Sequence, residues 1–162
     1  MIYDTIVVGA GPAGSSAARR CAQLGLSTLL LDQAIFPRDK LCGGALSEQA
    51  ISYLDFELPA GITERDVYGA RVHFGASCIE IRKPYRVAVT VSRTNFDHLL
   101  LKKAEEAGAK TLEGRRVSAL HCSHGWVEVV AGGDRYCGRI VIGADGFHSV
   151  VARYVRRKHS KD

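Results

Sequence analysis

Three glycines near the start of the chain have the spacing that lets a backbone turn bind a phosphate group. They are Gly9, Gly11 and Gly14, and they follow a short apolar run. The first permits a tight turn, the second leaves room for a pyrophosphate against the backbone, and the third lets a helix pack closely on a sheet. The helix that follows would offer free N–H groups and a partial positive charge to the anion.

An acidic residue, Asp32, follows the third glycine at close to the spacing of about 20 residues expected for a ligand of adenosine ribose hydroxyls. A carboxylate there repels the 2′-phosphate of NADP, so the motif predicts FAD or NAD without separating the two. A glycine-rich turn that binds no ligand is the alternative interpretation. A second glycine-rich turn, Gly143-Ala-Asp145-Gly146, ends another apolar run late in the sequence.

The cysteines and histidines predict no metal site. Five cysteines are widely spaced without a C-x-x-C pair, which argues against a disulfide framework or a structural zinc and favours a reducing, cytoplasmic setting. His121, Cys122 and His124 lie close together, but the sequence offers no second cluster of ligands.

The elements that must position these residues alternate between strands and helices. Apolar runs at 2–8 and 27–31 predict buried strands, joined by a helix from Pro12 to about Leu24 that Gly25 ends. Strand, helix and strand together have the length of a mononucleotide-binding half. The sequence therefore predicts an α/β fold, a Rossmann-like FAD/NAD(P)-binding domain with a central parallel sheet and a β-hairpin layer.

Further along, Ser47 is expected to cap a short helix, and Thr94 to cap a longer one with Asp97 in a near capping box. The 162 residues suffice for a single domain, 1–162, with 66–92 as a strand excursion. The remaining expected elements are strands at 67–75, 77–82, 86–91 and 110–120, a hairpin of 126–130 with 136–142, and a final helix over 149–157.

Charge is concentrated at the C-terminal end. The formal net charge is +5, and Arg153–Asp162 holds five Lys/Arg and one acid. Such a segment could contact anionic lipid at a membrane surface, or simply be solvated. The scarcity of aromatic residues among its cations argues against nucleic-acid binding. The chain has no apolar run of membrane-spanning length and no basic leader, so we expect a cytoplasmic protein, with peripheral membrane contact as an option.

Four segments together resemble the geranylgeranyl reductase family of FAD-dependent oxidoreductases, within the aromatic-hydroxylase-like FAD-binding group. The resemblance covers residues 1–155. Its most specific part is the Pro-Arg-Asp-Lys-x-Cys-Gly-Gly loop; the other parts are shared with hydroxylases and flavin-dependent halogenases. The four segments are Gly9–Gly14, Leu31–Gly44, Arg93–Asp97 and Gly143–Ser149.

The resemblance implies a set of contacts with an extended FAD. It assigns Cys42 as a candidate catalytic residue, although Cys42 could also be a loop residue without chemistry. Arg38 and Lys40 could be solvated charges, Val117 ordinary core, and Arg93 a partner of Asp97. The implied cofactor-binding residues are Gly9, Gly11, Pro12, Ala13, Gly14, Asp32, Gln33, Arg38, Lys40, Cys42, Gly43, Gly44, Ala45, Arg93, Val117, Asp145 and Gly146.

The activity implied is reduction of carbon–carbon double bonds in isoprenoid or prenyl-lipid substrates, as in bacteriochlorophyll or lipid biosynthesis, with NAD(P)H as one candidate electron donor. A flavin-dependent monooxygenase or halogenase, and a non-catalytic nucleotide-binding module, are the alternatives. Family members continue beyond the Gly-Ala-Asp-Gly turn with most of a substrate-domain sheet. We therefore expect this chain to represent the N-terminal portion, with 66–92 part of a partial substrate sheet.

Overall fold

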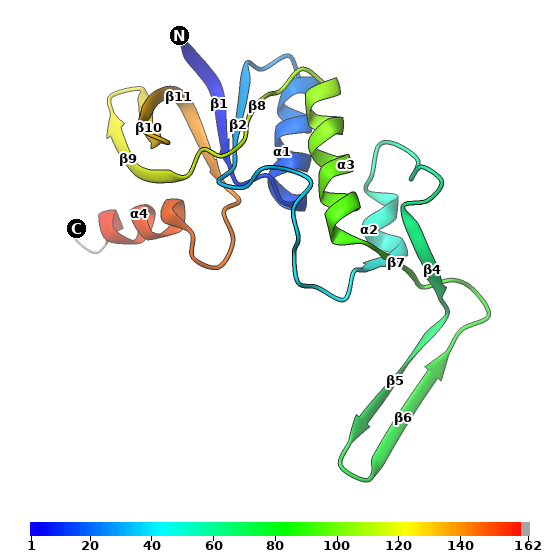
Figure 1. The fold of residues 1–162 in the computed structure, drawn as a ribbon. Helices are drawn as coiled ribbons and strands as arrows, with labels where there is room; N and C mark the ends of the chain where they lie inside the picture. The colour runs from blue at the N-terminus through cyan, green and yellow to red at the C-terminus, as the bar shows by residue number, and fades with distance from the viewer. Residues whose placement is uncertain (160–162) are drawn as a thin grey trace. The chain divides into compact units, whose positions relative to one another are not determined.

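The computed structural model describes residues 1–159, and side chains as far as residue 156. The chain divides into two compact units (Figure 1). Unit 1 consists of Met1–Arg38 and the residues from Asp97 onward, and unit 2 is Asp39–Phe96. Unit 2 is thus a longer segment than the strand excursion expected at 66–92.

Unit 1 is built on a six-stranded sheet with the order β8-β2-β1-β11-β10-β9. The strands β8, β2, β1 and β11 pair in parallel, and β11, β10 and β9 pair antiparallel. The expected central parallel sheet and hairpin layer are therefore confirmed. The strands are β1 (Ile2–Val8), β2 (Thr28–Leu31), β8 (Lys110–Leu112), β9 (Val117–Ser123), β10 (Trp126–Ala131) and β11 (Asp134–Gly143).

Both faces of the parallel strands are covered, which explains why β1 and β2 are mostly apolar. On one face, Val7 and Leu30 pack with residues of α1 (Pro12–Gln23) and α3 (Arg93–Glu106). Figure 1 shows these two helices side by side, and Arg19 Nη1 donates to the Lys103 carbonyl at 2.6 Å. The opposite face packs against β9, β10 and α4 (Val150–His159), through residues that include Leu120, Val129 and Val151.

The hairpin of β10 and β11 confirms the hairpin predicted over 126–130 and 136–142. Ala131 pairs with Asp134, and Gly132 and Gly133 between them both have positive φ angles, 58° and 89°. Two such residues suit a tight turn whose twist matches the strands. β11 then continues past the hairpin and pairs with β1 from Cys137 to Gly143.

Two predictions of local structure were wrong. The strand expected at 110–120 is two strands, because β8 pairs with β2 at one edge of the sheet and β9 with β10 at the other. The cap expected at Thr94 is also absent, since α3 begins one residue earlier. Thr94 Oγ1 instead donates to Asp39 Oδ1 at 3.3 Å.

Unit 2 contains a three-stranded antiparallel sheet, of which two strands were not expected. Ser47 caps α2 (Glu48–Ser52) as predicted, because its Oγ accepts the Ala50 N–H at 3.1 Å. A separate two-stranded hairpin extends from the unit, and all its strand residues except Gly69 are exposed. The strands are β3 (Ala45–Ser47), β7 (Ala88–Val91) and β4 (Thr63–Val67) in the sheet, and β5 (Gly69–Phe74) and β6 (Ser77–Arg82) in the hairpin.

The basic segment predicted for the C-terminal end begins on α4. Val151 of this helix is buried in the core, whereas Arg153 and Arg156 are exposed. Residues 160–162 lie outside the described part of the chain. Through residue 159, no helix combines the length and the apolar character needed to cross a bilayer.

Candidate functional site

The first glycine turn joins β1 to α1, and two of its glycines are required by packing. Gly9 has a φ of +98°, and a Cβ on it would lie 2.4 Å from the Ala144 carbonyl oxygen. A Cβ on Gly14 would lie 1.7 Å from the Gly9 carbonyl oxygen. The contact with Ala144 also means that the turn at Gly143-Ala-Asp-Gly146 lies directly against the first.

Gly11 differs from its two neighbours in the motif, because it faces open space. The nearest atom to a Cβ built on it is Arg38 Nη2, at 3.9 Å. Gly11 is the N-cap of α1, Pro12 follows in the first turn, and that turn has neither a side-chain cap nor an acidic residue. The N–H groups at such a helix start lack intrahelical partners and favour an anion.

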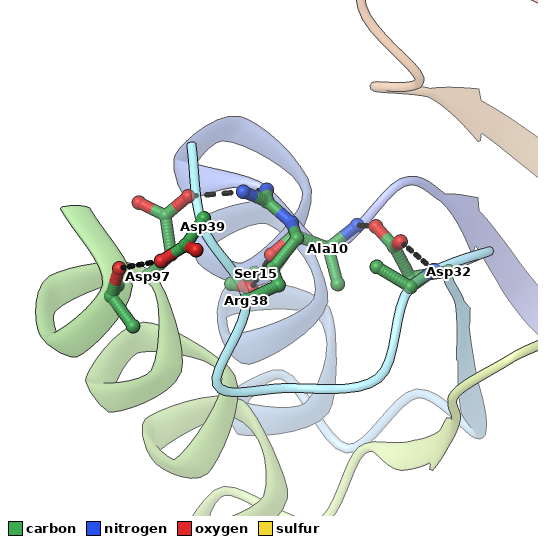
Figure 2. Close-up of polar contacts among 8 residues, drawn as sticks. Ala10, Ser15, Asp32, Arg38, Asp39 and Asp97 are labelled. Carbon is green, nitrogen blue, oxygen red and sulfur yellow. Dashed lines mark hydrogen bonds and ion pairs between the residues drawn. The ribbon is translucent and has the colours of Figure 1, made fainter. Parts of the chain in front are cut away.

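Asp32 directly follows β2, and its carboxylate is held by hydrogen bonds from the backbone, one of them from the first glycine turn. Its Oδ2 accepts the Ala10 N–H at 2.6 Å, and its Oδ1 accepts the Ala34 N–H at 2.7 Å (Figure 2). Each carboxylate oxygen has a second lone pair. Asp32 can therefore hold the loop in place and still accept hydroxyl groups of a ribose. Gln33 beside it is exposed.

Arg38 is held between a carboxylate and an aromatic ring. Its Nη2 lies 3.2 Å from Asp97 Oδ2 (Figure 2), and its guanidinium carbon lies 4.8 Å from the centre of the Phe36 ring. Its other terminal nitrogen, Nη1, is buried and has no hydrogen-bond partner among the described residues. Asp97, expected in a capping box, thus has an ion pair with Arg38.

Together these groups fit a dinucleotide pyrophosphate. The open Gly11, the uncapped start of α1 and the guanidinium of Arg38 supply space, backbone donors and positive charge in one place. An unpaired buried donor is unfavourable by about 1–3 kcal/mol, which an anionic oxygen would relieve. Arginine is well suited to phosphate because its donors form a planar fork.

The second glycine turn organises α4. Asp145 accepts the Val150 N–H at 2.6 Å and a hydrogen bond from Ser149 Oγ. Gly146 has a φ of +79° and is exposed. Val117 is buried in the core cluster, which favours its alternative interpretation as ordinary core. The cofactor contacts of these residues stay predictions.

The remaining predicted site residues belong to unit 2. Lys40, Cys42 and Gly43 are exposed, and Ala45 opens β3. Gly44 has a φ of +70°, and a Cβ on it would lie 2.1 Å from the Val91 carbonyl oxygen, so its presence is explained by packing inside the unit. Arg93 is the first residue of α3. Among the described residues, no group of three or more potential ligands could hold a metal ion.

The position of Asp97 on its helix is a sequence signal for a buried ion pair. Asp97, Leu101 and Ala104 share one face of α3, and all three are almost completely buried. A carboxylate on the apolar stripe of an amphipathic helix requires a partner, and Arg38 is that partner.

Comparison with known sequences gives a family match over residues 2–161, to the FAD binding domain. Geranylgeranyl diphosphate reductase of Rhodobacter capsulatus is 35% identical over 161 residues, covering 96% of this chain and 40% of the relative. Menaquinone reductase of Mycolicibacterium smegmatis is 35% identical over 165 residues, covering 95% and 40%. The chain thus spans about two fifths of the length of these relatives. An uncharacterized protein of Methanosarcina barkeri, 31% identical over 166 residues, is covered to 86% of its length by 93% of this chain.

Solved structures agree with this match. A geranylgeranyl bacteriochlorophyll reductase-like protein from Thermoplasma acidophilum superposes with a TM-score of 0.80 at 28% identity, over 90% of this chain and 40% of that one. The halogenase PltM, solved with phloroglucinol and FAD, gives 0.76 at 20% identity, over 95% and 36%, and shows a shared fold. The glycine turns, Asp32 and the match over nearly all of its length place this chain in the FAD binding domain family of oxidoreductases.

Proposed function

We propose that this chain is the cofactor-binding portion of an FAD-dependent reductase acting on carbon–carbon double bonds of isoprenoid chains. The observation that carries the cofactor part is the buried Nη1 of Arg38, which has no hydrogen-bond partner in the described part of the chain and whose guanidinium adjoins the open Gly11. The isoprenoid part is supported by the relatives, since geranylgeranyl diphosphate and menaquinone both contain isoprenoid chains.

In this proposal the residues of unit 1 bind and orient the cofactor. The N-terminus of α1, Gly11 and Arg38 bind the pyrophosphate, and Asp32 accepts the ribose hydroxyl groups. Bound FAD would supply the two-electron chemistry of alkene reduction, with NAD(P)H as a candidate donor of the electrons. Binding the adenosine end through a preformed loop fixes the position of the reactive end, which lowers the entropy lost on reaching the reacting geometry.

The cofactor part is tested by titrating the purified chain with FAD and following quenching of flavin fluorescence. We expect saturable binding that Gly11→Val and Asp32→Ala both weaken. Arg135→Met is the matched control, because Arg135 is exposed and its partner Glu128 lies on the neighbouring strand. If FAD, ADP and NAD all fail to bind the folded chain, the proposal is wrong.

The substrate part is tested on the FAD-loaded chain reduced with dithionite and incubated with geranylgeranyl diphosphate. Mass spectrometry should show products heavier by pairs of hydrogen atoms. Oxygen consumption with an aromatic compound, and no hydrogenated product, would instead assign the chain to the hydroxylases and halogenases. FAD binding without either reaction would indicate a nucleotide-binding module.

A further inference from the structure

We propose that Asp97 is a positioning residue, which holds the Arg38 guanidinium beside Gly11 so that it meets the pyrophosphate of FAD. The inference rests on the FAD binding proposed above and extends it to a residue that has no contact with the ligand. Arg38 comes from the loop after β2, and Asp97 comes from α3, distant in sequence.

The Arg38–Asp97 ion pair is largely removed from solvent. The side chain of Asp97 is 0% exposed and that of Arg38 is 20% exposed. Desolvating two charges offsets most of their attraction, so a buried pair contributes little more stability than well-packed apolar residues of the same volume. Stability alone therefore does not explain why two charges are placed here, and control of the guanidinium's orientation does.

The contacts define that orientation. Arg38 Nη2 both bonds to Asp97 and is the atom nearest to the open side of Gly11. The Phe36 ring, itself buried, packs against the guanidinium, which restricts the plane in which it can lie. Arginine has many rotamers in water, and a ring and a carboxylate together leave few of them.

The Nη1 atom of Arg38 still lacks a hydrogen-bond acceptor. The protein satisfies Nη2 and leaves Nη1 buried without a partner in the described chain. Any small rotation that brings Nη1 to an oxygen is favoured, and a pyrophosphate over Gly11 would supply that oxygen. Asp97 holds Nη2 beside Gly11 while this happens, so the second N–H of Nη2 and the donors of Nη1 are left for the ligand.

The experiment measures FAD affinity in a double-mutant cycle on the full chain, with the melting temperature of each protein recorded without FAD. Arg38→Met should weaken FAD binding by about tenfold to a hundredfold, the range of a lost charged hydrogen bond. Asp97→Asn keeps the size of the side chain and removes its charge, and we expect about a fivefold to tenfold loss. In the Arg38→Met background, Asp97→Asn should then have no further effect on affinity.

The cycle separates positioning from a general structural role. Loosening of the fold would weaken FAD binding whether or not Arg38 is present, and that result would overturn the inference. So would an Asp97→Asn protein that binds FAD as tightly as the original chain. If Asp97→Asn does not fold, Asp97→Glu takes its place: it keeps the charge but moves the carboxylate by one methylene, so unchanged affinity would overturn the inference. Failure of the original chain to bind FAD would refute the proposed function instead.

Discussion

Gly14→Ala should lower the stability of the fold, whereas Gly11→Ala should weaken FAD binding and leave the fold intact, although the two glycines belong to one motif. A Cβ at Gly14 would lie 1.7 Å from the Gly9 carbonyl oxygen and 2.8 Å from its carbon. Both atoms are backbone and cannot rotate away. Overpacking typically costs about 1–3 kcal/mol, and we expect Gly14→Ala to lose at least the upper value because the turn itself must move.

Gly11→Ala should leave the fold almost unchanged. Gly11 has a φ of −68° and a ψ of −176°, which alanine adopts without strain, and its nearest neighbour is the end of a flexible side chain at 3.9 Å. The free energy of unfolding should therefore change by no more than about 1 kcal/mol. The new methyl group would occupy the space through which a phosphate approaches, so FAD affinity should fall at least about tenfold.

Urea unfolding followed by circular dichroism measures the first effect, and titration of FAD fluorescence measures the second. The reasoning would be refuted by a Gly14→Ala protein as stable as the original chain. It would equally be refuted if Gly11→Ala bound FAD with undiminished affinity while remaining folded. Loss of stability in both variants to the same degree would show that Gly11 is also required by packing.

Three further predictions follow from individual contacts. Asp32→Ala should lower the free energy of unfolding by about 1–3 kcal/mol and weaken FAD binding, because two backbone N–H groups lose their acceptor; urea unfolding and FAD titration test this. Gly44→Ala should destabilise unit 2, where its Cβ would meet the Val91 carbonyl, so hydrogen exchange should rise in β3 and β7 and stay unchanged in β1 and β2. Hydrogen bonds from Ser27 lower the pKa of the exposed Asp4 carboxyl from its usual value of about 3.9. Ser27→Ala should therefore be less stable than the original chain at pH 7, and urea unfolding should show the difference shrinking as the pH falls below 4, where Asp4 becomes protonated.

The sequence was sufficient for those features that depend on residues close together in the chain. The β1–α1–β2 unit, the cap at Ser47 and the Gly132-Gly133 turn follow from local patterns, and the structure has all three. The FAD-binding part of the family resemblance, which rests on short motifs, is confirmed by the match to the FAD binding domain over residues 2–161.

Features that depend on distant pairing could not be obtained in this way. Gly114, with a φ of +67°, interrupts the run 110–120, and the two halves pair with β2 and β10 toward opposite edges of the sheet, which the run itself does not reveal. The Thr94 hydroxyl could bond to the helix backbone or to Asp39, and it bonds to Asp39, which lies 55 positions away in the sequence. The ion pair between Arg38 and Asp97 could likewise not be predicted from local sequence, since the two residues are separated by 59 positions.

The order of the sheet has a consequence for how the protein folds. β1 and its neighbour β11 are the first and the last strands of the described chain, and six residues of β1 pair with β11 between Cys137 and Gly143. Closing so long a loop is slow, because its entropy is lost before the pairing compensates for it. During synthesis β1 has β2 beside it and one apolar edge without a partner, a state that favours aggregation. Expression at low temperature, or with chaperones that shield such an edge, should therefore raise the yield of folded chain more than stabilising substitutions in β10 or β11 would.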